Sequence, residues 1–249
     1  AISRADRVIL AGDHCQLPPT IKCIEAARGG LGRTLLEKVV LHKPETVSLL
    51  KIQYRMHEDI MRFPSRWFYH DELEAAPEVK YRGILDFDTP VSWIDTSELD
   101  LQEKAVAEGT GRLNTGEAEL LVRELKNYME RIGIRRILEE HIDFGVISPY
   151  RAQVHYLRHL LKKEPFFRPC RRLITVHTVD GFQGQERDVI MISLVRANEK
   201  GQIGFLRDLR RMNVAITRAR MKLLILGEAV TLTRHPFYRE LYEYIGGLR

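Results

Sequence analysis

The stretch from His177 to Arg220 places the strongest constraint on how this chain folds. It contains a polar loop with glycines, a run typical of a buried strand from Asp188 to Val195, and a helical segment that ends in closely spaced arginines. Between Arg196 and Lys222 there are eight basic residues and two acidic ones. A local charge bias of this kind suits phosphate groups, and the alternative is a charged face exposed to solvent. The stretch therefore predicts a sheet-based site for a polyanionic ligand.

Strands and helices are predicted in alternation through most of the chain. A strand is expected at Arg7–Asp13, and a β-rich run begins at Thr46. Helical periodicity then follows Asn114, which with Glu117 forms a variant of the capping box. Further expected strands are Val91–Asp95, Asp143–Ile147, Leu173–Val176 and Leu223–Leu226, and further expected helices are Thr34–Val40 and Phe237–Ile245. This alternation predicts an α/β fold with a mostly parallel sheet flanked by helices.

Length and composition narrow the class of protein. The 249 residues are enough for one large domain, or for one domain and a piece of another. No apolar run of about 18 residues is present, so no membrane span is predicted, and the N-terminus lacks the order of a secretory leader. It begins abruptly, as a fragment would. The three cysteines form no CxxC pair, which favours a reducing, cytoplasmic setting without structural zinc.

Two motifs look like sites and are interpreted otherwise. The run ARGGLGRT, from Ala27 to Thr34, lacks the first glycine, the lysine and the preceding strand of a phosphate loop. It is interpreted as a glycine-rich lead into a helix. His155 and His159 have the spacing of a zinc pair, but Tyr156 stands where a metalloprotease has glutamate and no third ligand is evident. No metal site is therefore predicted.

Polar side chains at the ends of predicted strands indicate a nucleotide site. Gln16, Arg55 and the loop Asp180–Glu186 each follow a strand, and the carboxyl edge of a parallel sheet is where ligands bind. Arg218 ends the last helix before a strand. Guanidinium groups pair with phosphate oxygens and remain charged, so two arginines could act as arginine fingers on a terminal phosphate.

Five ordered motifs resemble those of a known family. They are GDHCQLPP, QYRMH, ISPYRAQV, TVDGFQGQERDVIMISLVRAN and GFLRDLRRMNVAITRAR. In order and spacing they resemble motifs III, IV, a post-IV motif, V and VI of the superfamily 1 helicases. The branch they resemble includes the up-frameshift RNA helicase, senataxin and the immunoglobulin mu-binding helicase. The resemblance covers nearly the whole chain and is weakest from Glu74 to Gly111.

The resemblance implies a role for individual residues. Gln16 would sense the γ-phosphate, and Arg55 and Arg218 would be the arginine fingers. The other implied positions are Tyr54 near adenine, Gly184 for close backbone approach, Glu186 near the ribose, and Ser148, Tyr150 and Thr178 on the nucleic-acid backbone. For each polar residue the alternative is a cap or turn hydrogen bond.

The same resemblance implies a domain organisation. Residues 1–46 would be the tail of a first RecA-like domain, with motif III and a connection, and residues 47–249 a second RecA-like domain with motifs IV to VI. The chain lacks a GxxxxGK[ST] phosphate loop and the Asp-Glu pair that holds magnesium. Ligands for ATP and Mg²⁺ are therefore expected upstream as well, and the fragment alone is expected to be inactive.

The expected function is that of an ATP-dependent helicase or translocase. Its partners would be single-stranded DNA or RNA and the first RecA-like domain of the same chain, in the cytoplasm or, in a eukaryote, the nucleus. The resemblance implies 5′ to 3′ movement. The alternative is a non-catalytic module, derived from a helicase domain, that binds nucleic acid or protein.

Overall fold

The computed structural model describes residues 5–19, 21, 23–106 and 111–248. Contacts divide the chain into two compact units between Leu50 and Lys51. Within the described ranges, none of the helices combines the length and the hydrophobicity that a bilayer span requires.

The first unit is small and helical. It contains α1 (Ile24–Ala26), a π-helical turn (Ala27–Leu31) and α2 (Leu35–His42). Thr34 begins α2 with a full capping box, since its hydroxyl accepts from Glu37 N at 3.1 Å and Glu37 Oε2 accepts from Thr34 N at 2.8 Å. The helix that the sequence predicts after the glycine-rich run is confirmed.

The strand predicted at Arg7–Asp13 is wrong. The described backbone of this segment forms no strand, and Ile9 is 95% exposed. An apolar run becomes a strand only where a neighbouring strand takes up its backbone hydrogen bonds. The described part of the first unit offers no such neighbour.

The second unit is built on a five-stranded parallel sheet. Its strands are β3 (Val91–Asp95), β6 (Phe144–Ser148), β7 (Ile174–Thr178), β8 (Arg187–Ser193) and β9 (Ala219–Gly227), in the order β3-β9-β8-β6-β7. Every described pairing in this sheet is parallel. The fold class predicted from the sequence, a mostly parallel sheet flanked by helices, is confirmed. Short pairs β1 (Ile52–Gln53) with β2 (Glu74–Ala75), and β4 (Lys104–Ala105) with β5 (Arg112–Leu113), lie outside it.

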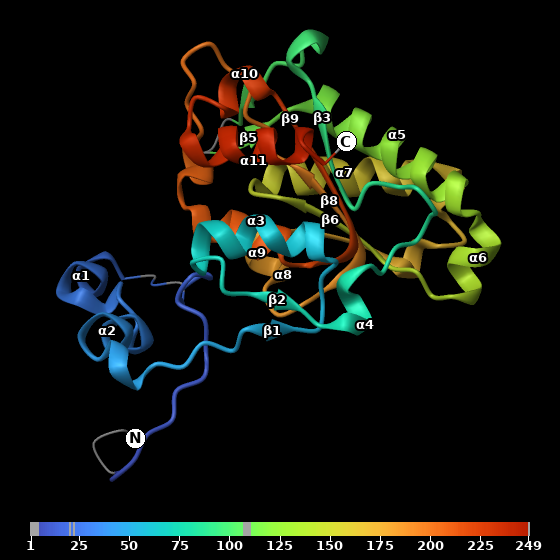
Figure 1. Ribbon diagram of the computed structural model, residues 1–249. Coiled ribbons are helices and arrows are strands. Elements are labelled where there is room, and N and C mark those ends of the chain that lie inside the picture. The colour runs from blue at the N-terminus through green and yellow to red at the C-terminus, as the bar shows by residue number, and fades with distance from the viewer. Residues whose placement is uncertain (1–4, 20, 22, 107–110, 249) are drawn as a thin grey trace. The chain divides into compact units, whose positions relative to one another are not determined.

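Helices cover both faces of this sheet (Figure 1). α5 (Thr115–Ile132) and α7 (Arg151–Lys163) pack on one face, and α3 (Glu58–Phe68), α8 (Val179–Phe182), α9 (Leu209–Ile216) and α11 (Pro236–Gly246) pack on the other. α4 (Pro77–Lys80), α6 (Ile134–Glu139) and α10 (Ala229–Leu232) are short connecting helices. Sheets covered on both faces are buried on both, which explains the apolar runs of β6, β8 and β9.

The face under α8 requires close packing at Gly145 on β6. A Cβ atom at this position would lie 2.5 Å from Ile190 Cδ1 and 2.9 Å from Phe182 Cζ. Phe182 belongs to the loop segment that the sequence singles out, so the missing side chain of Gly145 lets this segment lie against the sheet.

The segment from Thr178 to Arg187 runs along the sheet from the carboxyl ends of the strands to their amino ends. Thr178 ends β7 at the carboxyl edge and caps α8, whereas Arg187 begins β8 at the amino edge. The sheet is about five residues deep here, which corresponds to roughly 16 Å at ~3.3 Å per residue. This one loop therefore supplies side chains both to the carboxyl ends and to the amino ends of the strands.

Candidate functional site

Arg55 and Glu186 meet although they lie far apart in the sequence. The Arg55 guanidinium forms an ion pair with the Glu186 carboxylate through Nε and Oε2. Arg55 Nη1 also donates to the carbonyl oxygen of Thr217 at 3.1 Å. Both charged side chains are about one-third exposed, at 34% and 40%, so the pair remains accessible to a ligand.

Arg218 lies beside this pair and is buried, with 2% of the residue exposed. Its Nη1 donates to Gln185 O at 3.2 Å, its Nε to Val214 O at 3.0 Å and its Nη2 to Thr217 Oγ1 at 3.1 Å. These bonds fix the guanidinium between the end of α9 and the loop before β8. Arg55, Glu186 and Arg218 therefore belong to one site.

Thr217 connects the two arginines, and sequence reasoning missed it. Its carbonyl accepts from Arg55 and its hydroxyl accepts from Arg218, while the hydroxyl donates to Asn213 O at 2.7 Å. Its place directly before Arg218, at the end of a helix, is the signal that could have identified it.

Two further predicted residues border this site. Tyr54 precedes Arg55 and is 68% exposed, so its ring is available to stack on a ligand. Gly184 has φ +80, and a Cβ atom there would meet no atom within 4 Å. Glycine is favoured at this position by its backbone conformation and not by crowding.

Arg220 extends the site toward three carboxylates. It lies 3.1 Å from Asp143 Oδ1, 3.1 Å from Asp188 Oδ1 and 3.8 Å from Glu186 Oε1. Burial raises the pKa of Asp188 above its usual range, and the Arg220 guanidinium opposes this shift. The Arg220 guanidinium therefore neutralises part of the charge of these three acids.

The basic residues between Arg196 and Lys222 are largely neutralised in the fold and do not form one phosphate site. Arg196 is buried against Glu103 at 2.7 Å, and Lys222 lies 3.2 Å from Asp88. Arg210 and Arg211 pair with Asp208. The acids come from other parts of the chain or flank the arginines, so a count over this window misses several of them.

The predicted position of the site at the carboxyl edge of the sheet is also wrong. Glu186 and Arg218 precede β8 and β9, and thus lie at the amino edge. Arg55 follows β1, which belongs to a separate two-stranded sheet. Arg55 reaches the site because the His57 amide donates to Arg220 O at 2.8 Å, which ties the QYRMH segment to the start of β9.

The residues expected to contact nucleic acid lie at the opposite, carboxyl edge. Thr178 is half-buried and its hydroxyl accepts from Gly181 N at 3.4 Å as the cap of α8. Ser148 is the last residue of β6 and Tyr150 lies two residues beyond it, but both are buried, at 0% and 2% exposure. The Tyr150 hydroxyl accepts from Arg196 Nη1 at 3.3 Å, and its ring packs on Phe205 with centroids 5.5 Å apart. This conformation therefore does not support direct contact between a nucleic-acid strand and Ser148 or Tyr150.

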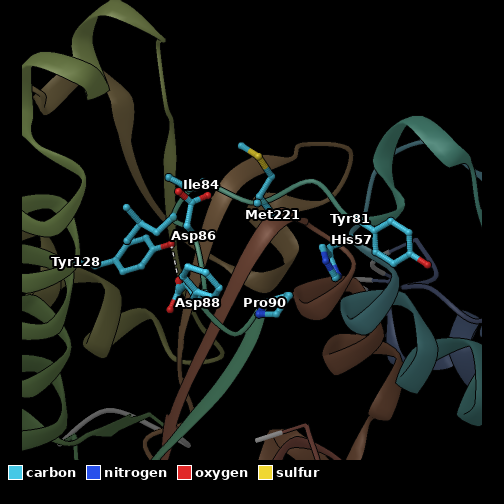
Figure 2. Close-up of a pocket in the computed structure, with 11 residues that line it drawn as sticks. His57, Tyr81, Ile84, Asp86, Asp88, Pro90, Tyr128 and Met221 are labelled. Atoms are coloured by element: carbon cyan, nitrogen blue, oxygen red, sulfur yellow. Dashed lines mark hydrogen bonds between the residues drawn. The ribbon is translucent and has the colours of Figure 1, made fainter.

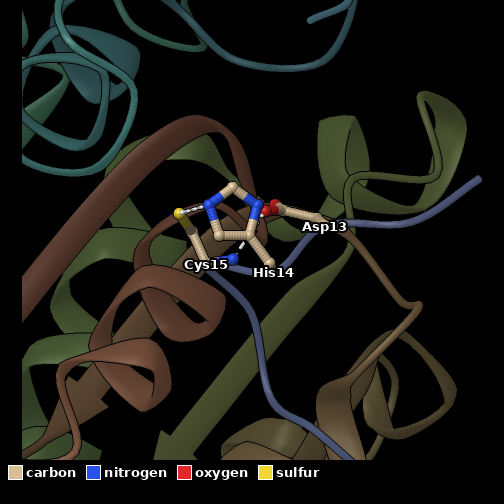
Figure 3. A group of neighbouring side chains, drawn as sticks. All are labelled: Asp13, His14 and Cys15. Atoms are coloured by element: carbon tan, nitrogen blue, oxygen red, sulfur yellow. Dashed lines mark hydrogen bonds between the residues drawn. The ribbon is translucent and has the colours of Figure 1, made fainter. Parts of the chain in front are cut away.

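Gln16 lies in the first unit. Its Nε2 donates to Asp13 Oδ2 at 2.7 Å, within a turn that also places Asp13, His14 and Cys15 together (Figure 3). Burial and the neighbouring Asp13 raise the pKa of the Cys15 thiol to about 11. The potential ligand atoms of these three side chains lie within 4.8 Å of one another, and exposed acidic groups often cluster in this way without a metal ion.

A cavity of about 390 Å³ lies beside His57 and is lined by Asp86, Asp88, Tyr128 and Met221 (Figure 2). The Tyr128 hydroxyl donates to Asp88 Oδ2 at 3.0 Å, and burial raises the pKa of this phenol. Two aspartates repel phosphate, so the cavity does not suit a nucleotide despite its size.

Comparison with known proteins agrees with the predicted class. The model of the AAA domain family matches residues 31–230. An uncharacterized ATP-dependent helicase of Methanocaldococcus jannaschii is 36% identical over 98% of this chain and 35% of its own length. The DNA-binding protein SMUBP-2 of Rattus norvegicus is 36% identical over 97% of this chain and 24% of its own length. The Regulator of nonsense transcripts 1 homolog of Drosophila melanogaster is 35% identical over 96% of this chain and 20% of its own length.

A solved structure, the C-terminal domain of a possible DNA helicase from Lactobacillus plantarum, is 14% identical and has a TM-score of 0.39 over 71% of this chain and 88% of its own. The chain spans about a third or less of the length of these curated relatives. The matched family model covers residues 31–230, most of the chain, and the chain therefore belongs to the AAA domain family.

Proposed function

We propose that this chain is the C-terminal portion of an ATP-dependent nucleic-acid helicase or translocase, to which it supplies arginine fingers and part of the single-strand binding surface. The observation that carries the proposal is the convergence of Arg55, Glu186 and Arg218 at one end of the sheet. The names of the relatives, which include ATP-dependent helicases, support the same class.

The residues of the site fit ATP by their chemistry. Two guanidinium groups provide planar, permanently charged donors for phosphate oxygens. Glu186 provides a carboxylate that can accept from ribose hydroxyls, and exposed Tyr54 offers a ring for the base. ATP bound with Mg²⁺ would supply the transferable phosphoryl group. Residues of a first RecA-like domain would hold the metal, since this sequence lacks a phosphate loop.

Arg55 and Arg218 would stabilise negative charge on the terminal phosphate. Arg218 is already fixed by hydrogen bonds to Gln185, Val214 and Thr217, so little reorganisation is needed when charge develops. Arg55 is more exposed and must exchange Glu186 for phosphate. Gln16 would report the state of the terminal phosphate from motif III.

Thr178 would hold the nucleic-acid backbone at the carboxyl edge of the sheet. The loop that begins at Thr178 ends at Glu186, so it joins the proposed strand contact to the proposed nucleotide contact within nine residues. ATP-driven closure of two domains would then change both ends of this loop together. Whether DNA or RNA is the substrate depends on contacts to the 2′-hydroxyl.

The rival function is a non-catalytic module that binds nucleic acid or a partner protein. A binding module does not require two arginines and a glutamate that are held together away from the proposed nucleic-acid contact. The site therefore favours the enzyme. The test is ATP turnover by the full-length protein with DNA and RNA oligomers of the same sequence. Stimulated turnover with either oligomer supports the enzyme, and binding without turnover supports the module.

A further inference from the structure

The segment from Arg151 to Arg172 carries uncompensated positive charge. It contains seven lysines and arginines and one acid, Glu164, which pairs with Lys126 at 3.6 Å. In the ranges that the structure describes, none of the seven takes part in an ion pair. They are Arg151, Arg158, Lys162, Lys163, Arg168, Arg171 and Arg172, and all are exposed. This contrasts with the arginines of 196–222, most of which pair with acids or are buried.

Three of these residues, Arg158, Lys162 and Arg171, line one cavity together with residues of β7, the strand at one edge of the sheet. Arg158 on α7 reaches over this edge, where its Nε and Nη2 donate to Val176 O at 3.0 and 2.6 Å. Its Nη2 lies 3.2 Å from His177 Nδ1. Burial and the nearby Arg158 and Arg187 lower the pKa of His177, which disfavours a further positive charge on this ring.

A cavity of about 390 Å³ opens beside the same edge. Its polar lining includes Arg158, Lys162, Arg171 and His177, and its apolar lining includes Phe167 and Ile174. Arg171 Nη2 donates to Lys162 O at 3.3 Å, which keeps the two cationic residues on one rim. Cations around an apolar floor match a phosphodiester backbone that carries bases, because the backbone meets the charges and a base meets the apolar surface.

This cavity adjoins the expected nucleic-acid contact in the sequence. His177 lines it and the next residue is Thr178, at the carboxyl end of β7. Arg158 covers the edge strand through its bonds to Val176 O, and charged side chains on edge strands hinder pairing with another strand. Lys162 and Arg171 make no such bond to β7 in the described contacts and face the cavity instead.

We infer that the groove formed by Arg158, Lys162, Arg171 and His177 is a second nucleic-acid contact, which holds the phosphodiester backbone of the strand beyond Thr178. This inference rests on the proposed function, because it extends the path of the same strand. Nucleic acid is favoured over an acidic peptide because the groove adjoins Thr178 and combines an apolar floor with its cations.

The test measures the affinity of the full-length protein for a single-stranded oligonucleotide at several salt concentrations by fluorescence anisotropy. The variant Lys162→Gln/Arg171→Gln removes two charges from the groove. Arg123→Gln/Arg239→Gln is the matched control, since both arginines are exposed and lie on α5 and α11, outside the groove. The variant Lys162→Arg/Arg171→Lys keeps both charges.

The groove variant is expected to bind about tenfold or more weakly, with a slope of log affinity against log salt that is about 1.4 smaller, because each phosphate contact to a single strand contributes ~0.7. The control and the charge-preserving variant are expected to keep the wild-type slope. If wild type binds and the groove variant shows the same slope, the inference is overturned while the proposed function stands. If wild type binds no nucleic acid, the proposed function fails first.

A second arm uses a polyglutamate peptide as the probe. If the groove variant loses affinity for this peptide and keeps its full affinity for the oligonucleotide, the groove belongs to an acidic protein partner and the inference is wrong.

Discussion

Glu186 forms an ion pair with Arg55 across 131 positions of sequence, and this pair joins the QYRMH segment to the loop before β8. Because both side chains are partly exposed, the pair contributes little to stability, on the order of 0–1 kcal/mol. The ion pair matters because it positions Arg55 beside buried Arg218, where a ligand phosphate could replace the Glu186 carboxylate.

Arg55→Ala is expected to lower kcat of the full-length ATPase by about 10³-fold, since it removes one guanidinium from the transferring phosphate. Glu186→Gln is expected to raise KM for ATP with a smaller effect on kcat, and to have no further effect on kcat in the Arg55→Ala background. Steady-state turnover of the two single variants and the double variant measures this coupling.

Arg66→Ala is the matched control, because Arg66 forms a similar partly exposed pair with Glu240 at 3.4 Å, between α3 and α11. We expect this variant to keep wild-type turnover. Wild-type kcat in Arg55→Ala would remove Arg55 from the site.

Glu117 should make the stability of the second unit depend on pH. It is fully buried on α5, where its Oε1 accepts from Ser193 Oγ at 2.5 Å and from Val195 N at 2.9 Å. Burial raises the pKa of this carboxyl from 4.5 to about 7. The folded state therefore binds a proton more tightly than the unfolded state, and stability falls as pH rises from 4.5 to 7, by up to about 3 kcal/mol at ~1.36 kcal/mol per pH unit.

Glu117→Gln should remove this dependence, since the amide oxygen can accept the same two hydrogen bonds without a charge. Urea unfolding at pH 5 and pH 8 is expected to show a larger loss of stability for wild type than for the variant. Glu130→Gln, an exposed change on the same helix, is expected to behave like wild type. Equal losses for wild type and Glu117→Gln would place the titration elsewhere.

The 249 residues alone are expected to hydrolyse ATP negligibly, because they contain no phosphate loop to position the β- and γ-phosphates. Colorimetric phosphate release by the purified chain, with Mg²⁺ and an oligonucleotide, measures this. Magnesium-dependent turnover that is lost in Arg218→Ala would show that the chain carries a complete site and would contradict the division proposed above.

Local sequence patterns predicted most of the second unit. The strand Val91–Asp95 has the predicted bounds, and Asn114 caps α5 by accepting from Glu117 N at 3.0 Å. These features depend on periodicity and on contacts three or four residues apart. The carboxylate of Glu117, in contrast, does not complete a capping box in the described contacts. It bonds Ser193 and Val195, which no short-range pattern could indicate.

The structure brings together three of the residues predicted for the site, but at the other end of the sheet from the one predicted. Motif resemblance identified Arg55, Glu186 and Arg218, and their contacts bring them together. The end of the sheet at which a loop residue lies depends on how far the loop has run toward the next strand. Glu186 is at the far end of the loop from Thr178, directly before β8, so it lies at the amino ends of the strands and not at the predicted carboxyl ends. The count of charges between Arg196 and Lys222 also failed to predict the local charge. The acids Glu103, Asp143 and Asp88 lie outside this window in the sequence but pair with its basic residues in the fold.

The proposed action of Arg218 on the terminal phosphate of ATP is tested by measuring both the turnover and the ATP affinity of the full-length Arg218→Ala variant. Because Arg218 is buried, circular dichroism and Arg218→Lys serve as controls for folding. We predict that hydrolysis falls by about 10³-fold or more in a folded Arg218→Ala protein whose ATP affinity changes less than tenfold. Wild-type turnover in that folded variant would show that Arg218 does not act on the terminal phosphate.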